Sequence, residues 1–184
     1  MGTPMPDTLT IAARLEAAFA KIEAERMDGI PILNPRLKVE AVGTRDWNGD
    51  WLSVLITPWF INLMLLPGTD EWAAVWADLP LGSRLAHTFP AGRFDFLVGE
   101  EEGIGRYQMC SLFSPVLEFE DQEAARIAAE AALEALFDAR IDESREPGGE
   151  PNAPRDDERE DASRRGISRR NLISGKIASG RGSV

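Results

Sequence analysis

The sequence predicts an α+β fold: an antiparallel β-sheet with an N-terminal and a C-terminal helix packed on it, followed by a disordered tail. Near each end of the first 140 residues, apolar side chains recur at helical spacing. Between these two segments the sequence alternates or is continuously apolar, as in strands, and short turn sequences separate the runs. Because short turns join antiparallel neighbours, we expect a meandering sheet with the helices on one of its faces.

The first helix is predicted from Thr8 to Met27, because its apolar residues share one face at a period of 3.6: Ile11, Leu15, Ala18, Phe19 and Ile22. Asp7 or Thr8 can cap its first amides, and Gly29 and Pro31 stop it. A first strand should follow, in which apolar residues alternate with their neighbours at Leu37, Val39 and Ala41.

The middle of the chain predicts a hairpin and two buried strands. Asn48-Gly49 has hairpin-turn chemistry, because glycine adopts positive φ without steric cost. The apolar runs 51–57 and 59–66 are separated by Pro58, which cannot donate to a ladder, and both runs look buried on two sides. A short helix is expected over 70–78, with Trp72 and Trp76 on one face.

The last part of the predicted domain contains two strands and a helix. Strands are expected over 93–99 and 104–113, joined by a turn at 100–103, and Ser114-Pro115 ends the second strand. Asp121 can cap a helix from Gln122 to about Arg140. The inner face of this helix would hold Ala125, Ala129, Ala132, Leu133 and Leu136.

The domain is therefore expected over residues 8–140 and a charged tail over 141–184. In the tail Ser, Pro, Gly and charged residues replace the apolar pattern, and such a composition cannot bury enough apolar surface to offset its ordering entropy. The tail still has one distinctive segment. Ser168 to Ile173 reads S-R-R-N-L-I, with Arg169 and Arg170 at its centre, like a twin-arginine export motif but without the long apolar stretch that should follow. The simpler interpretation is a basic end that pairs transiently with the acidic run 156–161.

Composition narrows the function classes. Through Arg145 there are 24 acidic and 12 basic residues, a balance that argues against a nucleic-acid partner, since phosphate binding needs cations. The single cysteine, Cys110, excludes an internal disulfide and a zinc-ribbon or rubredoxin-like site. The first residues do not look like a signal peptide, and the most apolar stretch, 51–66, is short for a membrane span. We therefore expect a cytoplasmic protein without stable membrane insertion.

Five short motifs occur in a specific order and spacing along the chain. They are Trp47-Asn48-Gly49-Asp50-Trp51, Ile56-Thr57-Pro58-Trp59, Pro67-Gly68, Phe96-Leu97-Val98-Gly99-Glu100, and the segment from Tyr107 to Pro115. Together they resemble the HybE family, also called HupJ or HoxT, over roughly residues 9–139, with a second similar patch near the end of the chain. The resemblance implies a cytoplasmic accessory chaperone of nickel–iron uptake hydrogenases. It also implies a hydrogenase subunit precursor as partner, either the small subunit with its twin-arginine signal or the large subunit, and no catalysis and no cofactor.

The candidate partner-binding residues come from these motifs and from the tail: Trp47, Trp51, Thr57, Pro58, Trp59, Gly99, Glu100, Tyr107, Cys110, Ser114, Pro115, Arg169 and Arg170. Trp47 and Trp59 are the stronger candidates, because they stand in turns, which tend to face outward. The alternative for every tryptophan is core packing, and for Cys110 an inert buried thiol. Glu100 belongs to a run of three glutamates that could be only a solvated loop.

Two rival functions remain open from the sequence. A small-molecule or metal carrier of the same maturation pathway is favoured if Cys110 and His87 share a pocket. An enzyme would need a deep pocket lined by Glu100 and Tyr107, and no serine elbow, phosphate loop or Cys–His–acid set is recognisable.

Overall fold

The computed structural model describes residues 7–143, and the tail residues 144–184, including Arg169 and Arg170, lie outside them. The described chain folds into helices and strands in an order that confirms the predicted α+β class. The elements are α1 Thr8–Arg26, β1 Glu40–Trp47, β2 Asp50–Ile56, β3 Ile61–Leu66, α2 Asp70–Ala77, β4 Arg84–Phe89, β5 Gly92–Glu101, β6 Gly105–Phe113, α3 Gln122–Leu136 and α4 Arg140–Glu143. None of the helices described is long and apolar enough to cross a membrane.

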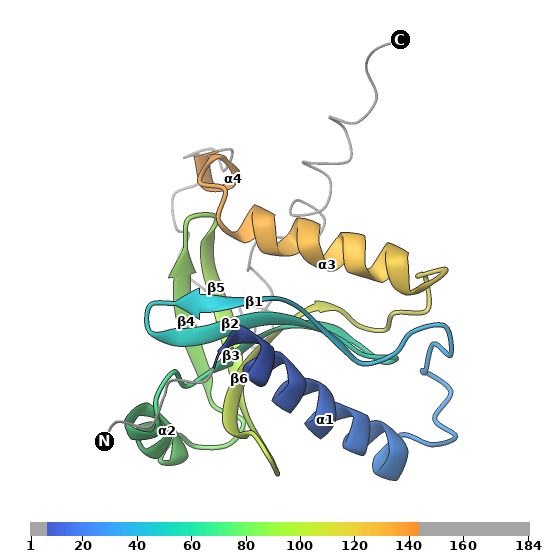
Figure 1. Cartoon of the computed structure of the whole chain (residues 1–184). Helices are drawn as coiled ribbons and strands as arrows, with labels where there is room; N and C mark the ends of the chain where they lie inside the picture. Colours follow the sequence, from blue (N-terminus) through green and yellow to red (C-terminus); the bar gives the residue numbers. More distant parts are fainter. Residues whose placement is uncertain (1–6, 144–184) are drawn as a thin grey trace, which may run out of the picture.

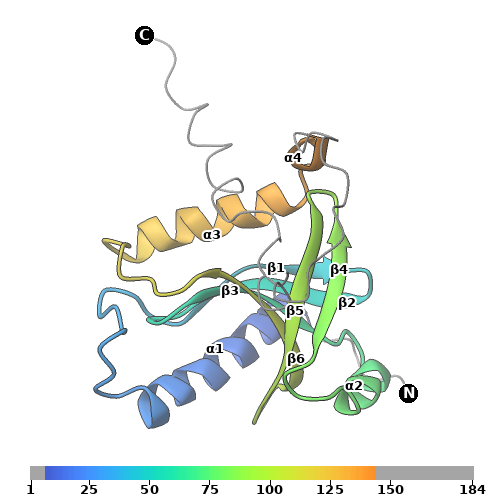
Figure 2. The same ribbon diagram turned by 180° about the vertical axis from the view of Figure 1, so that it is seen from behind.

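The sheet has six antiparallel strands in the order β1-β2-β3-β6-β5-β4. Helix α1 packs on β1 and β2 from one side, and α3 packs on the same strands from the other. Figures 1 and 2 both show α3 and α1 on opposite sides of the sheet. The expectation that both helices share one face is therefore wrong.

The physical reason is that the central strands are apolar on both faces and need two covers. In β2 and β3, one set of side chains (Leu52, Val54, Ile56, Ile61, Leu63 and Leu65) joins the core beneath α3. The alternate set (Trp51, Leu55, Met64 and Leu66) joins a second core beneath α1. The prediction that both runs are buried on two sides is confirmed, and the small alanines of α3 allow it to approach one face closely.

Local turn and cap chemistry is as predicted. Asn48 (φ 53°) and Gly49 (φ 84°) both adopt positive φ in the turn between β1 and β2, the conformation that two-residue hairpins require. The Asp7 carboxylate accepts from Thr10 N, and the Asp121 carboxylate accepts from Ala124 N, so both long helices have acidic N-caps.

Four element boundaries or faces differ from prediction. Strand β1 begins at Glu40, because Leu37 turns into the core beneath α3 before pairing starts. Strand β5 continues to Glu101, since backbone pairing with β6 persists there, and the turn begins at Glu102. Helix α3 ends at Leu136 and α4 follows it as a separate turn of helix that extends past residue 140. In α2, Trp76 is buried whereas Trp72 faces solvent, so the two rings do not share an environment.

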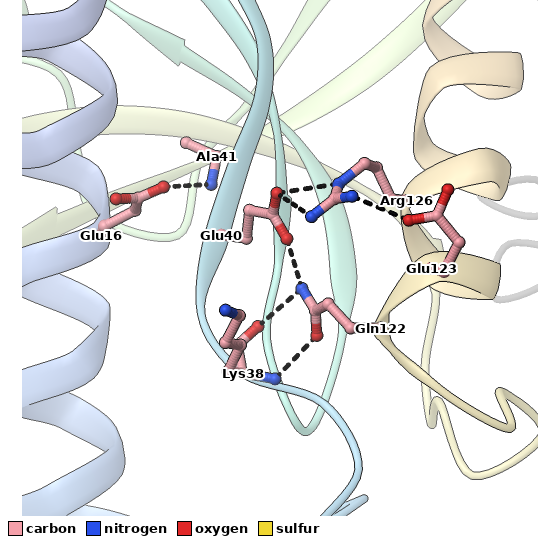
Figure 3. A network of polar contacts seen from close by, with 7 residues as sticks. All are labelled: Glu16, Lys38, Glu40, Ala41, Gln122, Glu123 and Arg126. Carbon is pink, nitrogen blue, oxygen red and sulfur yellow. Dashed lines mark hydrogen bonds and ion pairs between the residues drawn. The ribbon is translucent and has the colours of Figure 1, made fainter.

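A polar network at the start of β1 ties the three layers together (Figure 3). Glu16 of α1 accepts from Ala41 N at 2.9 Å. Glu40 accepts from Gln122 Nε2 at 2.6 Å and from Arg126 Nε at 3.0 Å, both on α3. The Glu40 carboxylate raises the pKa of Arg126 above its ordinary value through this hydrogen bond and its charge. The strand thus bonds to one helix on each side, which fixes both helices relative to the sheet.

Candidate functional site

The two edge strands of the sheet meet through aromatic side chains. The ring of Trp47, at the end of β1, stacks on Phe89 of β4 with centroids 4.2 Å apart and meets His87 edge-on at 5.7 Å. His87 also lies edge-on to Phe96 at 5.2 Å. Both views show the β1–β2 hairpin crossing the β4–β5 hairpin, so the twist of the sheet brings its first and last strands together. We call Trp47, Asp50, His87, Phe89 and Gln108 the aromatic corner.

Polar groups in the corner are held at fixed positions. His87 Nε2 lies 2.6 Å from Oε1 of the buried Gln108. Asp50 Oδ1 accepts from Gly68 N at 3.1 Å, and burial raises the pKa of Asp50 above its ordinary value. Gly68 has no room for a side chain, because a Cβ there would lie 1.6 Å from Gly49 O. Two of the sequence motifs, 47–51 and Pro67-Gly68, are therefore in direct contact.

Helix α2 begins beside the corner and presents an apolar and acidic outer face. Thr69 caps it immediately after Gly68 by accepting from Trp72 N at 3.2 Å. Trp72 is 52% exposed and Val75 is 50% exposed, unusually accessible for such large apolar residues. At spacings of three and four residues, Glu71, Val75 and Asp78 fall on the same side of the helix, next to Trp72. We call Glu71, Trp72, Val75 and Asp78 the α2 face.

Glu100 connects the sheet to α2 and is not in a loop. It stands in β5 opposite Arg106 of β6, and its Oε2 lies 2.7 Å from Arg106 Nη1. Arg106 Nη2 donates to Ala77 O at the end of α2 (3.2 Å). The next two glutamates also pair: Glu101 with Arg26 and Glu102 with Lys21 of α1. The segment expected as a solvated turn at 100–103 therefore begins as the end of a strand. Its glutamates form ion pairs that connect this strand end to α1 and, through Arg106, to α2.

A second group of motif residues meets at the opposite end of the sheet. Thr57 and Pro58 are buried, and Trp59 is only 8% exposed, so the expectation that this turn displays its tryptophan is wrong. Asn34 explains why, because its N–H donates to Pro58 O and its Nδ2 donates to Val116 O and Phe119 O. Ser114 and Pro115, joined by a cis peptide bond, are exposed just before these carbonyls.

Three further candidates lie along the middle of the sheet. Tyr107 is buried with its ring over Gly99 and edge-on to Phe19 of α1 at 5.9 Å, and burial raises the pKa of its hydroxyl. Trp51 is buried beneath α1. Cys110 is half-buried and packs against the core beneath α3. These positions face the interior.

The structure thus divides the predicted site residues between two ends and the core. Trp47 lies in the aromatic corner and Glu100 is linked to α2 through Arg106, whereas Thr57, Pro58, Trp59, Ser114 and Pro115 gather at the other end. Of the residues in the corner and the α2 face, only Trp47 was among the predicted site residues; the others were missed, namely Asp50, His87, Phe89, Gln108, Glu71, Trp72, Val75 and Asp78. Asp50 could have been found from its motif, but the meeting of β1 with β4 has no sequence signal.

The described residues contain no group of three or more His, Cys, Asp or Glu side chains that could hold a metal ion. The partner found for His87 is Gln108, an amide that fixes the imidazole by a hydrogen bond. Chemically, the corner and the α2 face offer exposed indole, aliphatic surface and carboxylates, which suit recognition of a chain with apolar and basic side chains.

The fold belongs to a known class of scaffold. It is similar to the solution structure of HybE from Escherichia coli, with a TM-score of 0.52 and 24% sequence identity over 78% of this chain and 85% of that one. At this identity the likeness shows the shared fold.

Sequence comparison establishes the family. The family model described as NiFe-hydrogenase assembly, chaperone, HybE matches residues 10–175, and the chain belongs to this family of hydrogenase assembly chaperones. It is 39% identical over 130 residues to the hydrogenase expression/formation protein HupJ of Bradyrhizobium diazoefficiens, covering 70% of this chain and 73% of that protein. It is 40% identical over 125 residues to protein HoxT of Cupriavidus necator, covering 62% and 69%. The resemblance inferred from the five motifs is confirmed.

Proposed function

We propose that this chaperone binds the precursor of a NiFe-hydrogenase subunit and holds it during assembly, cluster insertion or export. The family supplies the process, because its members are hydrogenase assembly chaperones. The proposal adds a physical act, the binding of an unfinished subunit, and a place on the molecule, the aromatic corner with the adjoining α2 face. We expect this binding to take place in the cytoplasm.

The observation that carries the proposal is the half-exposed Trp72 on a short helix whose first turn follows the Gly68–Asp50 contact of the corner. Leaving a large indole in water forgoes the stabilisation that its burial would give, about 25 cal/mol per Å² of apolar surface. An exposed tryptophan beside an exposed valine therefore supports a surface that is covered in a complex. Tryptophan is also among the residues that contribute most to binding when a partner buries them.

The corner keeps Trp47 in a fixed orientation, which lowers the entropic cost of using it in binding. Its ring is already stacked on Phe89 and held edge-on by His87, and it stays partly exposed. Nearby carboxylates, Asp50 and Glu71, suit a client segment that carries arginine or lysine among apolar residues. An unfinished subunit exposes more such segments than a finished one, because folding buries most large apolar side chains.

The test is co-purification of tagged chaperone with hydrogenase subunit precursors from cells that express the hydrogenase. Trp72→Ala should weaken capture, with a loss of about 2 kcal/mol, or roughly thirtyfold in affinity. Because Trp72 is half in solvent, thermal unfolding should change little. Ile127→Ala is the matched control, since Ile127 is 58% exposed but lies on α3. Equal capture by wild type, Trp72→Ala and Trp47→Ala, all folded, would contradict the proposed surface.

A further inference from the structure

We propose that the basic C-terminal segment of this chain, Ser168–Ile173, docks on the α2 face and the aromatic corner, and so occupies the client surface when no client is present. The inference rests on the proposed function for its regulatory meaning only. Docking itself is a property of the isolated protein. Four observations carry it. They are the exposed α2 face, the opposite charges of the folded domain and the tail, the position of the end of α3, and the extent of the family match, which includes the tail arginines.

The face has the chemistry to hold an arginine-rich strand of chain. Trp72 and Val75 provide apolar surface, and Glu71 and Asp78 flank them on the same side of α2. Asp50 is directly opposite Trp47 in the β1–β2 hairpin. In the described part of the chain, Glu71 and Asp78 take part in no ion pair. A guanidinium can stack on an indole and bond to a carboxylate at once.

The two parts of the chain have opposite charge. Residues 7–143 contain 24 acidic and 11 basic residues. Residues 163–184 contain six basic residues and no acidic one. Within them, Arg169 and Arg170 are followed by Asn171, Leu172 and Ile173, so two cations precede two large aliphatic side chains. This order matches a face on which carboxylates border Trp72 and Val75.

The end of α3 lies close to the corner, and α4 follows it as the last described element. Phe137, just after α3, lies edge-on to Phe89 with centroids 6.0 Å apart, and Phe89 stacks on Trp47 at 4.2 Å. From Glu143 to Arg169 there are 26 residues, and a coil of that length spans roughly 28 Å. The linker therefore starts on the side of the aromatic corner, and it must run along β4 and β5 to reach α2, which lies at their other end (Figures 1 and 2). The family match also runs to residue 175, so it includes these arginines.

Tethering makes weak docking effective. A segment on a linker of this length acts at an effective concentration of about 1 mM. If the free segment binds with a Kd of about 0.1 mM, the tethered one occupies the face roughly nine-tenths of the time, and a competitor binds about tenfold more weakly. A client must then displace the tail, which would discriminate against weak, incorrect partners.

The test reads the five tryptophan indole N–H signals of the full-length protein by NMR. The variant is Arg169→Gln with Arg170→Gln, and the matched control is Arg164→Gln with Arg165→Gln, a neighbouring arginine pair of equal charge. The indoles of Trp47 and Trp72 should move in the variant and stay in place in the control, whereas the buried Trp51, Trp59 and Trp76 stay in place in both. A synthetic peptide of residues 166–175 should bind the variant about tenfold more tightly than wild type.

A second pair of variants tests the receiving face. Glu71→Gln with Asp78→Asn should reproduce the indole shifts, and Glu118→Gln with Glu120→Gln, exposed at the opposite end, should not. Unmoved Trp47 and Trp72 in the arginine variant overturn the inference, since the arginines then pair elsewhere, for example with 156–161. Equal shifts from both arginine pairs also overturn it, because they mean diffuse charge attraction. Indole shifts together with unchanged client capture by Trp72→Ala would sustain the docking and reject the proposed client surface.

Discussion

Gly99 and Tyr107 are both motif residues, and the structure assigns them to each other instead of to a partner. A Cβ at position 99 would lie 2.5 Å from Tyr107 Cζ and 2.7 Å from the hydroxyl oxygen. The two residues are direct cross-strand neighbours in the β5–β6 pair. The ring cannot swing away freely, because it is 8% exposed and packs edge-on against Phe19 of α1. We therefore expect Gly99→Ala to destabilise the fold.

The size of the effect follows from the displacement that the methyl group demands. Ordinary carbon contacts begin near 3.4 Å, so the ring must shift by about 0.9 Å against the α1 core. Overpacking of this kind costs typically ~1–3 kcal/mol. Alanine in a strand is otherwise favoured over glycine by ~0.5–1 kcal/mol, which offsets part of that cost. In a Tyr107→Ala background the clash is absent, so Gly99→Ala should be neutral or slightly stabilising.

A double-mutant cycle in urea measures this coupling directly. Wild type, Gly99→Ala, Tyr107→Ala and the double variant are unfolded at equilibrium, and the coupling energy between the two sites should equal the overpacking cost of about 1–3 kcal/mol. If Gly99→Ala is as stable as wild type but loses client capture, Gly99 is a contact residue and the packing explanation is wrong. An equal cost of Gly99→Ala in both backgrounds would refute the explanation as well.

Two other changes test the remaining interior contacts. Asn34→Ala removes both N–H donors that satisfy Val116 O and Phe119 O, and should lower the free energy of unfolding by ~2–4 kcal/mol. Asn34→Asp keeps the acceptor oxygen but loses these donors, so it should destabilise the fold at least as much. An Asn34→Asp variant as stable as wild type would contradict the role of these two hydrogen bonds. Asp50→Asn should raise the free energy of unfolding at neutral pH. Burial raises the pKa of Asp50 above its ordinary value of 3.8, so the folded state binds the proton of this carboxyl more tightly than the unfolded state does. Burying the charged carboxylate therefore lowers the free energy of unfolding at neutral pH. This loss of stability disappears as the pH falls below 3.8, where the carboxyl is protonated in both states. Urea unfolding at several pH values should show the gain of Asp50→Asn shrinking on acidification, and a less stable Asp50→Asn at pH 7 would reject this reading.

The elements that local chemistry controls were predicted well. Helix α1 has its caps and buried face where the spacing of Ile11, Leu15 and Phe19 placed them, and the Asn48-Gly49 turn has the required positive φ values. Both signals are local, because capping, turn conformation and helical periodicity depend on residues a few positions apart. The continuous apolar runs of β2 and β3 likewise predicted burial on two faces, although a second covering helix was not inferred from them.

The candidate site was predicted only in part, because exposure depends on distant residues. Trp59 stands in a turn, and turns usually face outward, but Asn34 draws that turn inward by binding the Pro58 carbonyl. Glu100 looked like part of a solvated loop, but Arg106 six residues later extends the strand pairing past it. In both cases the environment of the motif residue depends on a contact with a residue outside its own motif: Asn34 for the Trp59 turn and Arg106 for Glu100.

The sequence by itself determined the two long helices, the strands other than β4, the acidic balance and the family, because each of these follows from residue order, spacing and composition. Only the tertiary structure decided which faces the helices cover and which tryptophans remain accessible. Trp47 reaches Phe89 and His87 across 40 residues because the sheet twists until its first and last strands meet. Twist accumulates over all six strands, so no short stretch of sequence records where it brings the edges together.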